Sequence, residues 1–152
     1  MADISRIERE MNYLTTSENV PVTKVERIDG KNLEWKVIFE GPEASAYEDG
    51  IFTLKFVFPQ NYPTGGPEAL FITPMFHPNV RVGDQHVCIN LLNSWDPQRT
   101  IEDVILGIID IMINPSTIGA YGNPASTLLG QDPDAYYDKV EEYTYQHAKK
   151  AL

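Results

Sequence analysis

The sequence predicts an α+β fold in which helices flank one small antiparallel sheet. Two patterns carry this prediction. Near the start of the chain and again after Thr100, hydrophobic residues recur at the spacing of a helix. Between these segments, hydrophobic and polar residues alternate with the period of two that a half-buried strand shows. The 152 residues fit one ordinary domain, so we expect residues 1–152 to form a single unit.

The first helix is expected to begin after Asp3, whose short carboxylate is suited to cap a helix N-terminus. Ile4, Ile7, Met11 and Leu14 follow at helical spacing and define one apolar stripe. The chain therefore opens with an amphipathic helix.

Strands are expected after Pro21, where the period of the pattern changes. Residues 33–39 and 52–58 each place a hydrophobic side chain at every second position. The pairs Asp29-Gly30 and Asp49-Gly50 precede these segments and favour tight turns. The middle of the chain therefore predicts an antiparallel meander.

Irregular backbone is expected next. Five prolines between Pro59 and Pro78 exclude a helix there and divide any strand into short pieces. Ordered irregular segments on a rigid scaffold often hold functional residues. This segment is therefore where we look for chemistry.

A central helix is expected after the irregular segment. Thr100 and Asp103 have the spacing of a capping box. The isoleucine-rich residues that follow form an apolar stripe, and Leu106, Ile111 and Ile113 widen it. A helix with so wide an apolar face is predicted to be buried.

A closing helix is expected after a glycine-containing loop. Asp132 and Pro133 supply an N-cap and a first-turn proline. The residues that fall on one face of this helix are Tyr136, Val140, Tyr143 and His147.

Charge and cysteine content exclude several classes of protein. Acidic residues outnumber basic residues 22 to 12, so the net charge is −10 and a nucleic-acid partner is disfavoured. No apolar stretch has the roughly 20 residues of a membrane span, and no secretion signal is visible. One cysteine disfavours structural disulfides and indicates a reducing compartment. We therefore expect a cytoplasmic or nuclear protein without a membrane partner.

The single cysteine, Cys88, is the candidate nucleophile. A lone cysteine in an apolar context is more often a buried small side chain than a nucleophile. Upstream, however, His77-Pro78-Asn79 offers groups suited to fix a loop or to stabilise an oxyanion. Two functions are therefore compatible with these residues: a cysteine hydrolase with His77 or His86 as the base, and a thioester carrier. The histidines lack the paired spacing of zinc ligands, so no metal is expected.

A set of short motifs extends over nearly the whole chain, in the order Gly41-Pro42, Tyr47-Glu48-Asp49-Gly50, Phe58-Pro59, Tyr62-Pro63, Pro67, Phe71, Thr73, His77-Pro78-Asn79, Val87-Cys88, Trp95, Pro97 and Thr100-Ile101. In these motifs and their approximate spacing the chain resembles the ubiquitin-conjugating enzymes. The resemblance implies a UBC-like fold: an N-terminal helix, a four-stranded antiparallel meander, an active-site segment and C-terminal helices.

The resemblance also implies roles for individual residues. It makes Cys88 the acceptor of ubiquitin or a ubiquitin-like modifier as a thioester, which is passed to a substrate lysine. Asn79 stabilises the oxyanion or holds the loop, and His77 with Pro78 fixes the same loop. Arg6 and Arg9 are expected to bind the activating enzyme. The expected ligase-binding residues are Thr64, Pro97 and Gln98.

ATP is consumed by the activating enzyme, so the resemblance implies no bound cofactor. The expected partners are the modifier, the activating enzyme, a ubiquitin ligase and substrate proteins. A non-catalytic ubiquitin-binding module of the same fold is the alternative, and such variants lack the nucleophile that Cys88 supplies.

The chain departs from the family pattern near Cys88. The spacing from Asn79 to Cys88 is one residue longer than usual, the spacing from Cys88 to Trp95 is one shorter, and Gly66 replaces a usual proline. Asn90 stands where many relatives have an acid, and residues 114–121 contain no carboxylate. We therefore expect slow transfer to free lysine. The alternative is that Asp84, Asp96 or another acid supplies the acceptor.

Overall fold

The computed structural model describes residues 1–28, 30, 31, 33–116 and 123–149, and every structural statement concerns these residues. Helices and strands follow one another in the order α1 (Ile4–Thr16), β1 (Val22–Arg27), β2 (Glu34–Glu40), β3 (Ile51–Val57), β4 (Glu68–Phe71), α2 (Asn90–Asn93), α3 (Ile101–Ile113), α4 (Pro124–Gln131) and α5 (Pro133–His147).

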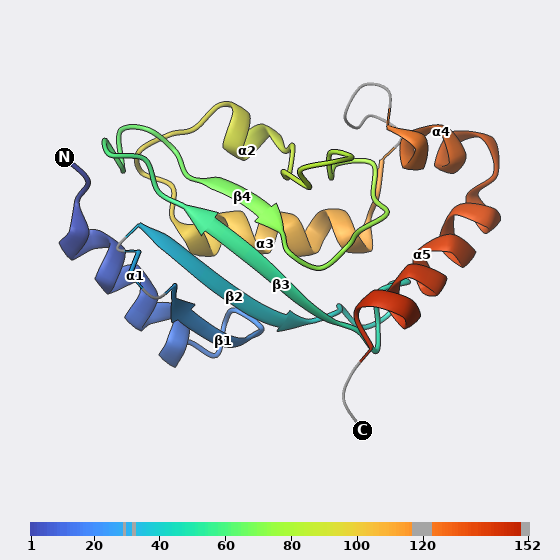
Figure 1. Ribbon diagram of the computed structural model, residues 1–152, viewed down its shortest axis with the longest axis horizontal. Helices are drawn as coiled ribbons and strands as arrows, with labels where there is room; N and C mark the ends of the chain where they lie inside the picture. Colours follow the sequence, from blue (N-terminus) through green and yellow to red (C-terminus); the bar gives the residue numbers. More distant parts are fainter. Residues whose placement is uncertain (29, 32, 117–122, 150–152) are drawn as a thin grey trace.

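The four strands form one sheet in the order β1-β2-β3-β4, and each pairs with its sequence neighbour in antiparallel orientation. The expected α+β fold with an antiparallel meander is therefore confirmed. Figure 1 shows α3 lying behind the sheet, α1 beside β1, and α4 with α5 at the opposite end of the molecule.

The sheet forms because one face of β2 and one face of β3 are fully apolar. In the register, Val37 pairs with Leu54 and Phe39 pairs with Phe52, so these side chains point to the same face. All four are 0–1% exposed. Burying this face against α3 supplies the main apolar core, which keeps the sheet rigid beneath the irregular segment.

The helix N-termini are capped as the sequence predicts. Asp3 accepts a hydrogen bond from the backbone N–H of Arg6. At the start of α3, Thr100 and Asp103 form both halves of the capping box. Asp132 caps α5 through the N–H of Ala135. None of the helices in the described ranges is long and apolar enough to cross a membrane.

Some apolar positions are more exposed than their spacing predicts. Ile4 is 40% exposed, because the first turn of α1 lines an open hollow beside Met1 and Leu33. Leu106 and Ile113 are 39% and 42% exposed, so they do not widen the buried face of α3.

The closing helix and the turns agree only in part with the sequence patterns. In α5, His147 is exposed while Thr144 is buried, so the buried face is rotated from the predicted one. The turn at Asp49-Gly50 is present, and Asp49 has a φ of 74°. Asp29, in the other expected turn, lies outside the described residues. Two short helices, α2 and α4, were not predicted.

Candidate active site

Cys88 lies on the irregular segment that connects β4 to α2. Its backbone N–H donates to the carbonyl of Asn79 at 2.8 Å. In return, Nδ2 of Asn79 donates to the carbonyl of Cys88 at 2.9 Å. These reciprocal bonds bring together two residues that the sequence analysis singled out, and they leave the cysteine partly exposed.

His77 is fixed by hydrogen bonds at both ring nitrogens. Nδ1 accepts from the N–H of Asn79 at 2.9 Å, which requires Nε2 to carry the proton and to donate to the Ile111 carbonyl at 2.6 Å. The ring is 2% exposed. This burial lowers the pKa of His77 to about 4, so the imidazole is neutral near pH 7.

The buried Asn123 holds the turn around Pro78, and the sequence analysis missed it. Its Nδ2 donates to the carbonyls of His77 at 3.0 Å, Pro78 at 3.1 Å and Val80 at 2.9 Å. Its Oδ1 caps α4 by accepting from the N–H of Ala125 at 2.8 Å. Asn123-Pro124 repeats the signal of an N-cap and first-turn proline that Asp132-Pro133 gives, so this helix start was detectable.

Gln85 anchors the loop between Asn79 and Cys88. Residues 81–86 form a tight turn between the bridged residues Val80 and Val87. Gln85 has a φ of 60° there, and Nε2 donates to the carbonyls of Phe71 at 2.9 Å and Thr73 at 2.8 Å. This loop is therefore tied to the end of β4.

The candidate acids near Cys88 are engaged elsewhere. Asp84 pairs with the Arg81 guanidinium and accepts from the N–H of His86 at 3.1 Å. The Arg81 side chain holds the pKa of Asp84 well below its usual range. Asp96 accepts from the N–H of Gln98 at 2.9 Å within its own turn. Residues 117–121 lie outside the described part of the chain.

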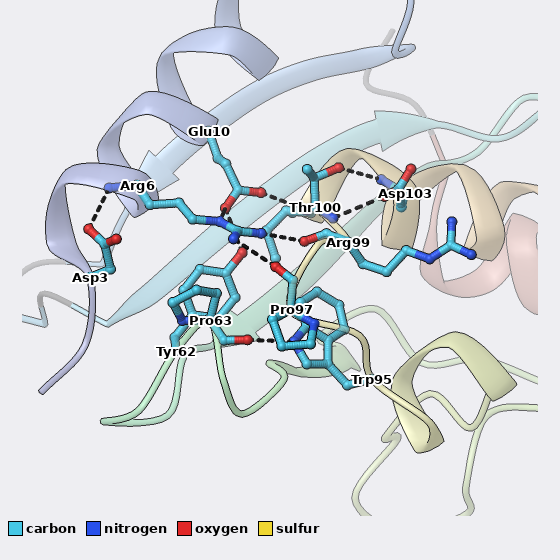
Figure 2. A network of polar contacts seen from close by, with 11 residues as sticks. Asp3, Arg6, Glu10, Tyr62, Pro63, Trp95, Pro97, Arg99, Thr100 and Asp103 are labelled. Atoms are coloured by element: carbon cyan, nitrogen blue, oxygen red, sulfur yellow. Dashed lines mark hydrogen bonds and ion pairs between the residues drawn. The ribbon is translucent and has the colours of Figure 1, made fainter.

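The expected partner-binding residues divide into two groups. Thr64, Pro97 and Gln98 are exposed, and their loops are joined because Trp95 Nε1 donates to the Pro63 carbonyl at 2.9 Å. Arg6, predicted to bind a different partner, donates to carbonyls of the loop that carries Pro97 and Gln98, as Figure 2 shows.

The two basic residues on α1 therefore differ in availability. The Arg6 guanidinium donates to the carbonyls of Pro97 at 2.7 Å and Arg99 at 2.5 Å, and only 19% of the side chain is exposed. Arg9 is exposed and forms no ion pair with another described residue. Within the described ranges, no three His, Cys, Asp or Glu side chains cluster in a way that could hold a metal ion.

The fold and sequence match known proteins over nearly the whole chain. The E2 domain of a Toxoplasma gondii ubiquitin-conjugating enzyme has the same fold, with a TM-score of 0.85 and 24% identity over 95% of this chain and 99% of that chain. Residues 6–144 match the ubiquitin-conjugating enzyme family.

Curated relatives agree with this assignment. Ubiquitin-conjugating enzyme E2 13 of Saccharomyces cerevisiae is 33% identical over 147 residues, which are 95% of this chain and 94% of the relative. Protein PEROXIN-4 of Arabidopsis thaliana is 36% identical over 118 residues, which are 76% of this chain and 75% of that protein. The chain belongs to the ubiquitin-conjugating enzyme family.

The buried neutral His77 makes stability depend on pH. The unfolded chain protonates this histidine near pH 6.5 and the folded chain near pH 4, so the unfolded state binds more protons between these values. Stability should fall as pH decreases through this window, by up to about 1.4 kcal/mol per pH unit from this group. Urea unfolding of the parent and of His77→Gln at several pH values measures the difference. Equal slopes would contradict the assignment.

Replacing Asn123 with aspartate should strongly destabilise the protein. Asn123→Asp keeps the cap of α4 but turns a carboxylate oxygen toward three carbonyl oxygens in a buried site. We expect a loss of about 3–5 kcal/mol at pH 7, as for an uncompensated buried charge. Asn19→Asp adds the same charge at an exposed position and serves as the control. Similar urea midpoints for the two variants would refute the role of Asn123.

Proposed function

We propose that Cys88 accepts ubiquitin or a ubiquitin-like modifier as a thioester and that the chain transfers it to a substrate lysine. Family membership supports this function. The observation that carries the proposal is the pair of reciprocal hydrogen bonds between Asn79 and the partly exposed Cys88, the only cysteine of the chain.

Two acyl transfers make up the reaction. The Cys88 thiolate attacks the carbonyl carbon of the modifier's thioester on the activating enzyme, the bond to that enzyme's sulfur breaks, and its thiolate leaves. A lysine amine then attacks the Cys88 thioester, an amide forms, the Cys88 thiolate leaves, and the proton lost by the amine passes to solvent water. The activating enzyme consumes ATP in forming the first thioester, so this chain needs no cofactor for either step.

Asn79 is proposed to hold the active-site loop and to donate a hydrogen bond to the oxyanion. A side-chain amide has two N–H groups. One donates to the Cys88 carbonyl, which keeps the amide next to the thiol. The second N–H has no acceptor among the described residues, so it is free to donate to the oxyanion that forms when lysine attacks.

His77 and Pro78 are proposed to hold the loop and take no part in proton transfer. Both ring nitrogens of His77 are already hydrogen-bonded away from the thiol. The two ring nitrogens of His86 face carboxylates: Nδ1 lies 3.2 Å from Oδ2 of Asp84, and Nε2 lies 3.7 Å from Oε2 of Glu68. No hydrogen bond joins either imidazole to Cys88 in the part of the chain that the structure describes. A cysteine hydrolase is therefore disfavoured.

The partner surfaces follow from exposure and charge. Arg9 is proposed to bind the activating enzyme, because its guanidinium is exposed and without an ion pair among the described residues. Arg6 contributes less free charge there, since it donates to two loop carbonyls. Thr64, Pro97 and Gln98 are proposed to bind the ligase. The modifier pathway implies a location in the cytoplasm or nucleus.

The acceptor lysine is proposed to receive little help from this chain alone. Asp84 and Asp96 are engaged in their own turns, and Asn90 and Ser116 carry no charge. A free lysine is mostly protonated at neutral pH. Transfer to free lysine is therefore slow unless a ligase or the substrate supplies an acceptor.

The non-catalytic ubiquitin-binding alternative is not favoured. The relatives named above include a conjugating enzyme, and this chain has a cysteine, Cys88, which the resemblance assigns as the acceptor. A binding module would not need Cys88 to be held by both the backbone and the side chain of Asn79.

Incubation with activating enzyme, ATP and modifier should give an adduct on Cys88 that reductant removes, because thioesters exchange with thiols. Cys88→Ser should give a more stable oxyester. Gels with and without reductant distinguish the two. A reducible adduct on Cys88→Ala would show that the nucleophile is elsewhere, and no adduct with any modifier would overturn the proposed function.

Removing the Asn79 side chain should slow discharge more than charging. In Asn79→Ala the backbone bond from Cys88 to residue 79 remains, so charging should stay nearly normal. Discharge to free lysine should slow about 100-fold, because one oxyanion donor is lost. Asn93→Ala, an exposed amide at the end of α2, is the control in single-turnover assays. Equal loss of both steps with a lower melting temperature would mean that Asn79 only holds the loop.

A further inference from the structure

The carboxylate of Glu10, on α1, accepts hydrogen bonds from one loop of the proposed ligase surface and from the residue that directly follows the other loop. This surface is made of two loops: residues 61–66, called the proline loop, and residues 95–100, called the tryptophan loop. We propose that Glu10 is a positioning residue for ligase-dependent transfer, because its hydrogen bonds fix the two loops relative to each other. The inference rests on the proposed function and assigns a new residue to the ligase surface.

Glu10 accepts three hydrogen bonds from three different parts of the chain. Oε2 accepts from the hydroxyl of Tyr62 at 2.5 Å and from Nε of Arg6 at 3.2 Å. Oε1 accepts from the backbone N–H of Ile101 at 2.7 Å. Ile101 is the first residue of α3 and directly follows the tryptophan loop. Glu10 therefore links α1 to the proline loop and to the end of the tryptophan loop (Figure 2).

Arg6 extends this linkage along the tryptophan loop. Its Nε pairs with Glu10, and its terminal nitrogens donate to the carbonyls of Pro97 and Arg99 at 2.7 and 2.5 Å. The guanidinium carbon also lies 5.3 Å from the centre of the Tyr62 ring. A guanidinium is a planar fork whose direction is set when one nitrogen is held. The Glu10 carboxylate therefore orients the bonds that Arg6 makes to the loop.

The two loops also contact each other directly. Trp95 Nε1 donates to the Pro63 carbonyl at 2.9 Å, and the rings of Tyr62 and Trp95 are 6.1 Å apart. A Cβ at Gly66 would lie 2.6 Å from Cγ of Trp95, so glycine is required for this close approach. Glycine at this position lets the indole lie against the proline loop.

The hydroxyl of Tyr62 is buried, so water cannot replace Glu10 as its hydrogen-bond partner. Tyr62 is 1% exposed, and burial together with the Glu10 hydrogen bond raises the pKa of its phenol. The phenol therefore stays protonated and donates to the carboxylate. A buried donor that loses its acceptor is destabilised. Removal of the Glu10 carboxylate is thus expected to loosen the proline loop.

The effect should appear in ligase affinity rather than in the chemical step. A ligase that binds both loops gains affinity when their spacing is fixed before binding, because less ordering entropy is lost. The hydrogen bonds of Glu10 involve Arg6, Tyr62 and Ile101, and none involves residues 76–88 that hold Cys88. Substitution of Glu10 should therefore leave unassisted discharge unchanged.

Three variants of the full chain test the inference. Glu10→Gln keeps the size of the side chain and removes its charge. Tyr62→Phe removes only the hydroxyl that donates to Glu10. Glu8→Gln makes the same change as the first variant at an exposed position on α1, where 53% of the side chain is exposed. Three quantities are measured for each variant. The first two are amide hydrogen exchange in both loops and charging of Cys88. The third is the rate of discharge as a function of the concentration of a RING domain that stimulates the parent protein.

In Glu10→Gln, the backbone amides of the two loops should exchange their hydrogens about tenfold faster than in the parent, because a hydrogen bond to a charged group is lost. This variant should need several-fold more RING domain for half-maximal stimulation, with unchanged unassisted discharge and maximal rate. Tyr62→Phe should show the same loss in part, and Glu8→Gln none.

Loop exchange and RING titration equal to the parent in Glu10→Gln would overturn the inference, as would an equal fall in unassisted discharge. Failure of every RING domain to stimulate a parent that charges normally would also overturn it. A parent that does not charge contradicts the proposed function instead. In that case the exchange measurement still decides whether Glu10 fixes the loops.

Discussion

The structure depends on how the irregular chain between β4 and α3 satisfies its backbone hydrogen bonds. Buried N–H and C=O groups must find partners, and a segment with little regular structure takes some of them from side chains. Asn123 donates to the carbonyls of His77, Pro78 and Val80, and Gln85 donates to two carbonyls at the end of β4. The active-site loop is thus held by a few side-chain amides in addition to isolated backbone bridges.

This mode of support explains the protonation state of His77. A ring that accepts from one backbone N–H and donates to one carbonyl must be neutral, and burial lowers its pKa in the same direction. The imidazole therefore acts as a bridge between the loop and Ile111 on α3. A side-chain amide also holds the backbone at Asn79, where one of its two N–H groups donates to the Cys88 carbonyl.

The sequence predicted the elements whose signals are local. Alternation at residues 33–39 and 52–58 and the capping box at Thr100 gave the sheet and α3, because burial and capping follow directly from spacing. The roles of Asn123 and Gln85 could not be predicted this way. Asn123 bonds to residues 43–46 positions away, and contacts of that separation leave no periodic pattern. Arg6 was assigned to the activating-enzyme surface from the resemblance, and its hydrogen bonds to carbonyls 91 and 93 positions away likewise left no pattern in the sequence.

The supports of the irregular chain divide into two sets that share no residue. His77, Asn79 and Asn123 hold the part around Cys88, whereas Arg6 and Glu10 hold the part before α3. On α3, the two sets contact Ile111 and Ile101, which are about 15 Å apart along a helix that rises 1.5 Å per residue. Sites without shared partners change stability independently. The chemical site and the proposed ligase surface can therefore vary separately within one rigid fold.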